Sequence, residues 1–390
     1  MSTPPPPVRL PLLGLAYLGF ISLGLPDGLL GVGWPSIRSD LDVPTASVGF
    51  ILALFTAGYL SSSVAAGFAI ARLGVGRLLA GSTALASLAL TGYALAPWLA
   101  VIVVFAALLG LGSGAIDSGL NAYAAGAFGA RHMNWLHASF GLGATIGPLI
   151  MTSVLAGGLS WRWGYGIVAG GQAVLATAFA VTAGAWAVRG RAATPSVAGP
   201  RAMDTLALPA VWLGALAFAV YTAIEVAAGL WAYLLLTEGR GTPGSVAGVC
   251  VSAYWGSLFL GRVVLGLVAE RLGSRRVLAT SLAGIAVGAL LVTLPASAVV
   301  AVIGLVLVGA AAAPVFPLMV LTTADRVGAE HADRTIGVQV GAAGLGGAVL
   351  PAAIGVVLSR VGVETLGPCL LVLAAALLVI YLTPALHRGR

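Results

Sequence analysis

Hydrophobic residues follow one another in long runs along almost the whole chain, and short breaks rich in glycine, proline and arginine separate these runs. Each run is about 20 residues long, which lets a helix cross roughly 30 Å of hydrocarbon. The first run carries no small-residue cleavage site, so we expect a helix that is kept and not a signal peptide. The pattern predicts twelve transmembrane helices, over residues 10–35, 46–70, 76–98, 100–126, 134–158, 162–188, 207–236, 245–270, 276–296, 298–324, 334–360 and 364–386.

The composition is that of a membrane protein and excludes an ordinary soluble one. Hydrophobic residues make up 59% of the chain and charged residues 8%, and the mean hydropathy is +1.05. A water-facing surface needs several times more charge than this. The sequence therefore predicts an all-α integral membrane protein.

The basic residues are divided unevenly between the two predicted sides of the membrane. All 19 of them are arginines. If the N-terminus is cytoplasmic, Arg38, Arg162, Arg240 and Arg360 fall on the outer side, Arg262 falls within a span, and the other arginines fall on the cytoplasmic side. This bias predicts a multi-pass protein of the cytoplasmic (inner) membrane with both termini in the cytoplasm. It also accounts for the pI near 9.9, so we expect no nucleic-acid partner.

The chain repeats itself at a spacing of 199 residues. The stretch "GFAIARLGVGR" at 67–77 aligns with "GLVAERLGSRR" at 266–276, and the two share a Gly, an Arg-Leu-Gly and a final Arg. Farther along, "FGLGATIGP" at 140–148 parallels "AGLGGAVLP" at 343–351. Similar segments that recur in the same order at spacings of about 200 residues indicate an internal duplication.

The longest polar stretch, "RGRAATPSVAGPRAMDT", lies between the two copies. We therefore predict a six-helix bundle over 1–188, a cytoplasmic linker over 189–206 and a second, pseudo-symmetric six-helix bundle over 207–390. In transporters built from such repeats, the substrate site lies between the halves near the middle of the bilayer.

The two repeated loops have a physical use. Their glycines let helices approach closely, and their arginines can bridge to helix ends and acids, which would hold one closed state until transport breaks the contacts. The loops resemble the loop between the second and third helices of the major facilitator superfamily, which reads Gly, three residues, Asp, Arg, any residue, Gly and then basic residues. Ala71 stands where that pattern has its acid, which implies a weakened lock in the first copy. The alternative is that both loops are only positive-inside turns. The matching positions are Gly67, Arg72, Gly74 and Arg77, and then Gly266, Glu270, Arg271, Gly273, Arg275 and Arg276.

Besides the residues of the loops and span ends, four ionisable residues stand out within the predicted spans: Asp27, Asp117, Glu225 and Arg262. A charge at the centre of a membrane helix costs about 2.5 to 3.5 kcal/mol, so such residues usually face a cavity, pair or carry a function. In "GLPDGLLG", we predict that Pro26 and the glycines break the first helix and free backbone groups to line a cavity. Asp27 and Glu225 are 198 residues apart, so they should face each other across the pseudo-symmetry axis.

Asp117 and Asn121 are one helical turn apart, so they should share a face of the fourth helix. A carboxylate in such a place can bind a proton near neutral pH and release it when the cavity opens to water. Asp27, Asp117 and Glu225 are therefore candidate proton-coupling residues. The alternative is that each is a neutral acid with one buried hydrogen bond. Arg262 is either a counter-ion for one of them or a side chain that extends toward the cytoplasm.

The fourth helix, "GLGSGAIDSGLNAY", resembles that of the fucose/proton symporter family, where an acid is followed four residues later by Asn. Asp117 takes the place of the acid and Asn121 that of the Asn, while Ala122 replaces a proline common in that family. Asp27 in "LPDGLL" matches the acid of its first helix. The resemblance implies proton-coupled uptake of a sugar, with Asp27 and Asp117 as proton sites.

Sugars are held by hydrogen bonds to amides and carboxylates and by contact with aromatic faces. Several of the candidates have a simpler interpretation: a hydrogen bond between helices for His137, an interfacial belt for Trp231, and a join between helices for Gln339. The candidate substrate contacts, besides Glu225, are Asn121, Asn134, His137, Tyr221, Trp231, Tyr254 and Gln339.

The sequence carries no enzyme motif, so we expect no catalytic residues. Cys250 and Cys369 support neither a disulfide framework nor a metal site, and we expect no cofactor beyond a proton gradient. We predict a monomeric secondary active transporter, embedded in the lipid bilayer, that moves a small polar solute, a sugar, by proton symport with alternating access. A proton-coupled efflux antiporter for drugs or metabolites is the alternative, and a membrane sensor that has lost transport is a third hypothesis.

Overall fold

The computed structural model describes residues 10–128, 130–186 and 201–383, without the side chains of 126, 130, 131, 134 and 265–272. Within the described residues, twelve helical segments are long and apolar enough to cross a membrane, which confirms the predicted number. The first six-helix bundle contains α1 (Leu10–Asp40), η1 (Thr45–Ser47), α2 (Val48–Leu73), α3 (Val75–Leu95), α4 (Leu99–Ala127), α5 (Ala130–Ala156), α6 (Arg162–Val181) and η2 (Ala183–Trp186).

The second bundle follows the linker and the short helix α7 (Ala202–Leu206). It contains α8 (Pro209–Leu234), the π-helical turn η3 (Leu235–Gly239), α9 (Gly244–Leu272), α10 (Ser274–Thr293), α11 (Ala298–Ala312), α12 (Val315–Leu321), α13 (Thr323–Val327), α14 (Ala329–Val361), η4 (Val363–Thr365) and α15 (Leu366–Leu382).

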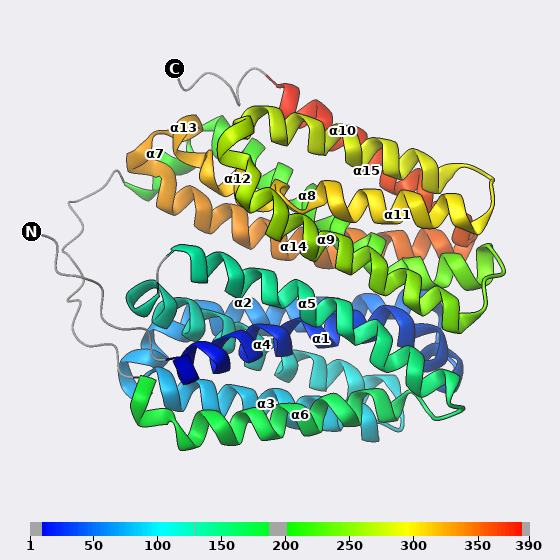
Figure 1. Ribbon diagram of the computed structural model, residues 1–390, viewed down its shortest axis with the longest axis horizontal. Coiled ribbons are helices and arrows are strands. Elements are labelled where there is room, and N and C mark those ends of the chain that lie inside the picture. Colours follow the sequence, from blue (N-terminus) through cyan, green and yellow to red (C-terminus); the bar gives the residue numbers. More distant parts are fainter. Residues whose placement is uncertain (1–9, 129, 187–200, 384–390) are drawn as a thin grey trace, which may run out of the picture.

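The two bundles lie side by side, and each has the same internal packing (Figure 1). In the first bundle α1 packs on α5, α2 on α4 and α3 on α6. In the second, α8 packs on α14, α9 on α11 and α10 on α15, which are the equivalent helices one repeat later. The repeat seen in the loops therefore extends to the packing of whole helices.

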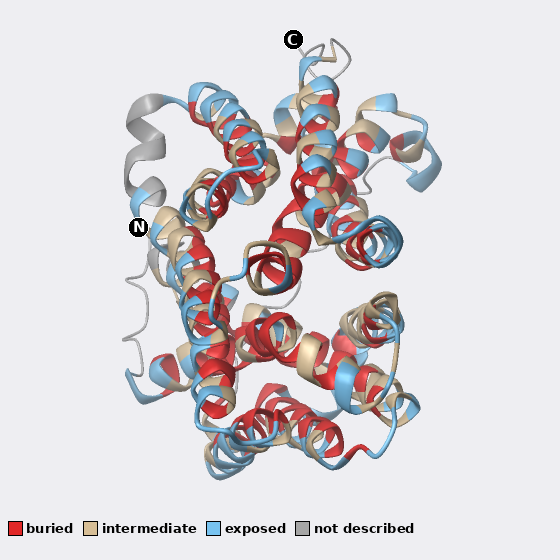
Figure 2. Ribbon diagram, turned by 90° about the vertical axis from the view of Figure 1, so that its right-hand side faces the viewer, coloured by how far each residue is buried: buried red, intermediate tan, exposed pale blue. Residues whose placement is uncertain are grey.

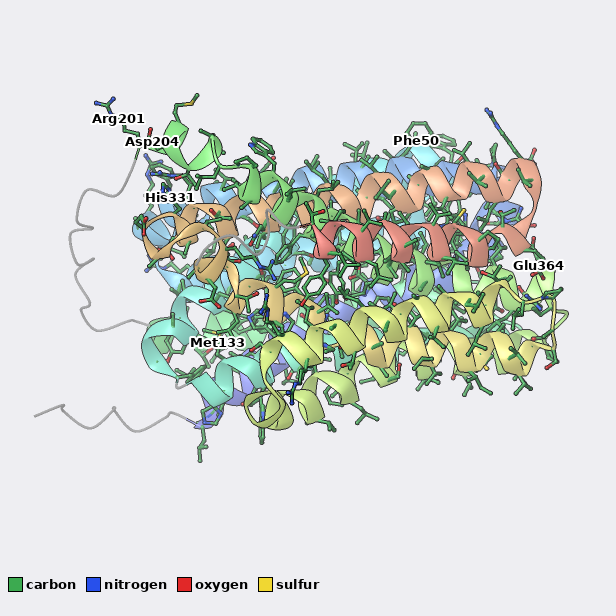
Figure 3. All side chains as sticks on the ribbon, turned by 90° about the horizontal axis from the view of Figure 1, so that it is seen from above. Phe50, Met133, Arg201, Asp204, His331 and Glu364 are labelled. Carbon is green, nitrogen blue, oxygen red and sulfur yellow. The ribbon has the colours of Figure 1, made fainter. Side chains whose placement is uncertain are left out.

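The two ends of the molecule carry different parts of the chain. The linker end bears the start of α1, the end of α6, the start of α8 and the end of α15 (Figure 1). The far end bears the loops over 41–44, 157–161, 240–243 and 294–297. In Figure 3, Arg201, Asp204 and His331 lie at the linker end and Glu364 at the far end.

Helix α1 is continuous from Leu10 to Asp40, so the predicted break at Pro26 is wrong. The proline removes one backbone hydrogen bond, and a helix packed in a bundle tolerates that loss. The glycines beside it permit close packing: a Cβ placed on Gly24 would lie 2.1 Å from the Phe140 carbonyl oxygen, and one on Gly28 would lie 2.5 Å from Pro148. Here glycine brings α1 and α5 together and does not interrupt the helix.

The tenth span is interrupted, although the sequence predicted one helix over 298–324. The chain there forms α11, α12 and α13, and Pro314 is the N-cap of α12. A proline in a helix interior cannot donate to the preceding turn and its ring clashes with that turn. Gly328, with φ of 88°, then redirects the chain into α14.

The glycines of the two repeated loops occupy equivalent turns. Gly74 has φ of 75° and is the single residue between α2 and α3, and Gly273 has φ of 82° between α9 and α10. Side chains with a Cβ rarely adopt this left-handed region, which explains why both copies of the loop place glycine there. Of the other loop residues, Arg72, Arg77, Arg275 and Arg276 are exposed, while the side chains of Glu270 and Arg271 lie outside the described part, and so do the surroundings of Gly266.

Buried residues line the contacts within each bundle and between the bundles, and exposed residues face outward, as Figure 2 shows from the far end. The bundles meet along three helix pairs: α5 with α9, α2 with α14, and α1 with α8. These six helices can therefore place side chains in a site between the bundles.

Candidate substrate site between the two bundles

A polar cluster surrounds Asp117 on α4 in the first bundle. The hydroxyl of Tyr59 on α2 donates a hydrogen bond of 2.7 Å to Oδ2 of Asp117, and Nδ2 of Asn121 donates one of 3.0 Å to Oδ1. Each carboxylate oxygen of Asp117 thus has its own donor. Asp117 and Asn121 share a helix face as predicted. Tyr59 did not emerge from the sequence, since only the packing of α2 on α4 brings it near.

A second cluster surrounds Glu225 on α8. Its carboxylate accepts hydrogen bonds from the Tyr221 hydroxyl and from Arg262, whose Nη2 lies 3.2 Å from both carboxylate oxygens. The Tyr254 hydroxyl donates 2.7 Å to the backbone carbonyl of Glu225. Arg262 is therefore the counter-ion of Glu225, the first of its two predicted roles.

Asp27 and Glu225 occupy equivalent places on α1 and α8. Both lie four residues before a glycine, and these two glycines, Gly31 and Gly229, bring the helices into contact: a Cβ placed on Gly31 would lie 2.8 Å from the Gly229 carbonyl oxygen. Residues four apart share a helix face. The two acids therefore point toward the opposite bundle, one turn nearer the linker end, and their charges interact.

Asp27 is solvent-exposed although it lies in the middle of α1, and its neighbours Pro26 and Gly28 are buried. His137 on α5 is also exposed, and its ring packs edge-on against Phe20 with centroids 5.2 Å apart. A charge on His137 would interact with both Asp117 and Arg262, so the histidine lies between the two polar clusters. The structure thus brings Asp27, Asp117, His137 and Glu225 to one region.

The space between the bundles widens toward the linker end. On α2 and α14, a Cβ placed on Gly49 near the far end would lie 3.0 Å from Ala352, and one on Gly344 near the middle would lie 3.6 Å from Leu60. One further turn toward the linker end, a Cβ on Gly341 would meet nothing within 4 Å.

The pair α5 and α9 is also packed most tightly near the far end, but it stays in contact past the middle, where a Cβ on Gly141 would lie 3.3 Å from Phe259. A Cβ on Gly248 near the far end would lie 1.7 Å from Thr152, whereas one on Gly256 near the middle would lie 3.5 Å from Thr145. The hydroxyl of Ser252, between these points, donates 2.8 Å to the Thr145 carbonyl. The bundles are therefore closed at the far end, and the exposed Asp27 and His137 are reached from the linker end.

Four of the predicted substrate contacts lie in the packed interior of the second bundle, and one of them is Tyr221, which is 1% exposed and also donates 3.0 Å to the Ala312 carbonyl. Trp231 is fully buried and its Nε1 donates 3.0 Å to the Pro351 carbonyl. Gln339 is 1% exposed and accepts a 3.0 Å hydrogen bond from Thr323, so it joins helices within this bundle. Tyr254 is also fully buried. Its hydroxyl is hydrogen-bonded to the backbone of α8 and does not face the space between the bundles. The side chain of Asn134 lies outside the described part of α5.

Among the described residues, no group of three or more His, Cys, Asp or Glu side chains is arranged to hold a metal ion. The site instead offers carboxylates, an amide, phenol hydroxyls, an imidazole and one guanidinium that is already paired. Such groups can exchange protons and can bind hydroxyl-rich solutes through hydrogen bonds.

Comparisons with known proteins agree with this architecture. The family profile of the Major Facilitator Superfamily matches residues 16–213 and 213–389. The human protein "Sodium-dependent glucose transporter 1" is 30% identical over 134 residues, which are 34% of this chain and 26% of that protein. The match spans about a quarter of the length of that curated relative.

Two solved structures have the same fold over almost the whole chain. One is a mutant form of the nucleoside transporter NupG, with a TM-score of 0.75, 16% identity, and coverage of 96% of this chain and 100% of that one. The other is nucleoside transporter NupG itself, with a TM-score of 0.69, 15% identity, and coverage of 97% and 98%. At this level of identity the likeness concerns the fold alone.

Proposed function

Because the chain belongs to the Major Facilitator Superfamily, whose profile matches both bundles, we propose that it is a secondary active transporter that couples a small polar solute to protons by symport. The observation that carries the proposal is the group of acids where the bundles meet. Asp27 and Asp117 lie on the first bundle, and Glu225 faces them from the second. Their position at a site reached from one end only is what alternating access requires.

The three acids have different partners, and this difference suggests different roles. Glu225 is paired with Arg262, so its charge is compensated in this structure. Asp117 is held by two donors, and Asp27 is exposed to the space between the bundles. We therefore assign proton coupling first to Asp27 and Asp117, while Glu225 with Arg262 forms the fixed polar wall opposite them.

A sugar, or a compound that carries a sugar ring, is the substrate class we propose. The Asn121 amide, the exposed His137 ring and the Asp27 carboxylate provide donors and acceptors for hydroxyl groups. The name of the glucose-transporter relative points to the same class of solute.

We further propose the orientation given by the arginine bias. The linker end would face the cytoplasm, in the cytoplasmic membrane, and the closed far end would face outward. The structure would then correspond to the inward-facing state of a monomeric carrier that needs no cofactor besides the proton gradient.

Uptake into proteoliposomes with a trapped pH-sensitive dye tests this function. An imposed inward proton gradient should drive accumulation of the correct sugar, and addition of that sugar outside should acidify the lumen. The Asp117→Asn variant should lose gradient-driven accumulation and keep counterflow exchange, because exchange needs binding and not proton release. Asp325→Asn, on the exposed surface of α13, is the matched control and should behave as the wild type.

Two results would contradict the assignment. Gradient-driven accumulation that survives in Asp117→Asn, with exchange lost, would place Asp117 in binding and not in coupling. Export of lipophilic cations in exchange for protons, with no sugar present, would instead support the efflux antiporter.

A further inference from the structure

Among the described residues, the far end contains three ion pairs, and they differ in what they join. One crosses between the bundles, and the other two lie within a single bundle each. The pairs are Arg38 with Glu238, Asp40 with Arg162, and Arg240 with Glu364.

In the first bundle, one arginine ties three helices together. Arg162 begins α6 and pairs with Asp40 at the end of α1. Its other Nη donates 2.9 Å to the carbonyl of Ala96, which is the C-cap of α3. The Trp161 ring packs against the same guanidinium, 4.4 Å from ring centroid to Cζ.

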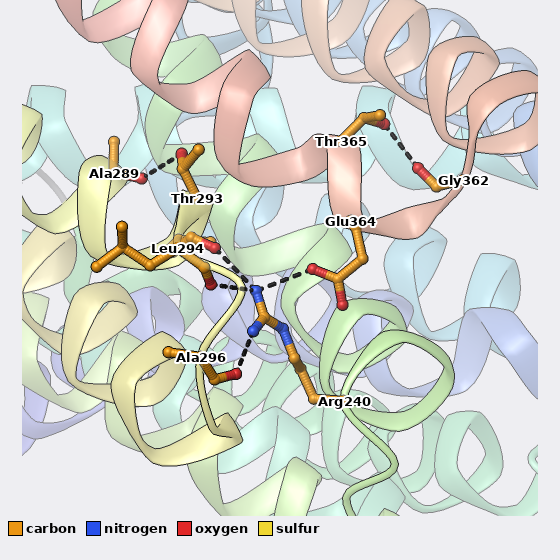
Figure 4. A network of polar contacts seen from close by, with 9 residues as sticks. Arg240, Ala289, Thr293, Leu294, Ala296, Gly362, Glu364 and Thr365 are labelled. Carbon is orange, nitrogen blue, oxygen red and sulfur yellow. Dashed lines mark hydrogen bonds and ion pairs between the residues drawn. The ribbon is translucent and has the colours of Figure 1, made fainter.

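In the second bundle, Arg240 makes the same kind of tie (Figure 4). It follows η3 at the end of the seventh span and pairs with Glu364, at 2.8 Å, just before α15. It also donates to the carbonyls of Leu294, at 2.9 Å, and of Ala296, after the end of α10. The first, third and sixth spans of each bundle are thus joined at the far end by a single guanidinium.

The three pairs also share a relationship of sequence. Asp40 and Arg240 are 200 residues apart, Arg38 and Glu238 are 200 apart, and Arg162 and Glu364 are 202 apart. These spacings are close to that of the repeat, so each position carries the opposite charge from its counterpart in the other half. The tie within each bundle is preserved because both of its members have exchanged sign.

This reversal matters most for the pair that crosses between the bundles. Near a pseudo-two-fold axis, equivalent residues of the two halves face each other. If Arg38 had an arginine as its counterpart, two like charges would oppose each other across the axis. Because the charges at 38 and 238 are opposite, they attract each other and hold the bundles together at this point.

We propose that Arg38 and Glu238 form a latch that holds the far end closed, and that this latch breaks in each transport cycle while the ties within the bundles remain. The proposal rests on the alternating access proposed above. Because the ties fix the end of α1 to α3 and α6, and the end of η3 to α10 and α15, each bundle moves as a unit at this end. The latch is then the ion pair that separates when the bundles part.

The exposure of the latch suits a contact that must open repeatedly. The side chains are 27% exposed for Arg38 and 44% for Glu238. Exposed ion pairs stabilise a structure only weakly and are screened by salt. The latch can therefore bias the closed state without making it permanent.

The test measures the opening of the far end directly. Spin labels are placed at Pro44→Cys in the first bundle and Ser245→Cys in the second, both exposed, in a background with Cys250→Ser and Cys369→Ala. Pulsed electron paramagnetic resonance of the full chain in liposomes then reports the distance between the bundles at this end.

Arg38→Glu and Glu238→Arg, each alone, should shift the distances toward longer values and raise the ratio of open to closed far ends by about two- to fivefold. The exchange R38E/E238R should restore the wild-type distribution. Unchanged distances in both single variants, or an exchange that behaves no better than they do, would overturn the proposal.

Two further measurements keep the test decisive if a charge reversal folds poorly. The neutral variant R38Q/E238Q removes the latch without repulsion and should still shift the distances. High salt should shift the label distances of the wild type in the same direction as the neutral variant does. Glu364→Gln is the matched control, because it breaks a tie within one bundle and should lower thermal stability without separating the bundles.

The distance measurement needs no substrate, so it separates the two proposals. Labels that respond as expected in a protein that transports no sugar would support the latch and refute the proposed function. Proton-driven sugar uptake with labels that do not respond would do the reverse.

Discussion

Tyr59 and Asp117 are 58 residues apart in the chain, yet the Tyr59 hydroxyl donates a 2.7 Å hydrogen bond to the Asp117 carboxylate. The bond links α2, which packs against α14 of the second bundle, to the acid that we assign to proton coupling. A change in how the bundles meet can therefore reach Asp117 through Tyr59.

Tyr59→Phe should lower proton-driven uptake by about tenfold, since a hydrogen bond to a charged group contributes about 1.5 to 3 kcal/mol. Counterflow exchange should change much less. Because Tyr59 acts through Asp117, adding Tyr59→Phe to Asp117→Asn should cause no further loss. Additive losses in the double variant would show that the tyrosine has an independent role. Initial rates in proteoliposomes measure all four forms.

Arg262→Gln should destabilise the protein more than the double change E225Q/R262Q. The single variant leaves the Glu225 carboxylate without its counter-ion, at a cost of about 3 to 5 kcal/mol, whereas the double variant removes both charges. Thermal unfolding in detergent, at one pH and detergent concentration, should give the order wild type, double variant, single variant. Equal melting temperatures for the two variants would mean that the ion pair is not coupled in the folded state.

Trp231→Phe and His137→Ala should separate packing from substrate contact. Trp231 is buried against α14, so its change should lower the melting temperature and leave the apparent affinity for substrate unchanged. His137 is exposed between the bundles, so its change should weaken binding with little effect on stability. Substrate protection in a thermal-shift titration measures both properties. A weaker affinity in Trp231→Phe would show that Trp231 contacts the substrate after all.

Gly24→Ala should destabilise the first bundle, because the new Cβ would lie 2.1 Å from the Phe140 carbonyl oxygen. Overpacking of this kind costs about 1 to 3 kcal/mol. Gly337→Ala on α14 is the matched control, since its Cβ would meet nothing within 4 Å. The control should melt at or slightly above the wild-type temperature, because alanine favours helix. A melting temperature for Gly24→Ala equal to that of the control would show that α1 and α5 can separate at no cost.

The sequence predicts the helices well because a bilayer demands a long apolar run for each span. The repeat spacing also gives the relation of Asp27 to Glu225, and helical periodicity gives that of Asp117 to Asn121. Contacts between helices distant in sequence, such as Tyr59 with Asp117, depend on helix rotation and packing, which hydropathy does not report. Trp231 and Gln339 were candidates by residue type alone, and the rotation of α8 and α14 turns them into the bundle interior.

Two other features left a signal that could have been found. The prolines at 314 and 317 mark the interruption of the tenth span, and the opposite charges at 38 and 238, 40 and 240, and 162 and 364 are visible once the repeat is aligned. Pro26, by contrast, shows the limit of such signals, because a proline in a packed membrane helix does not always end it.

The pair of Arg38 and Glu238 also constrains the history of the molecule. Two separate, identical six-helix subunits related by a true two-fold axis would carry the same residue at both of these positions, and like charges would meet. The pair could arise only after duplication allowed the copies to mutate independently. A single polypeptide thus acquired an attraction between its halves that no homodimer of either half could possess.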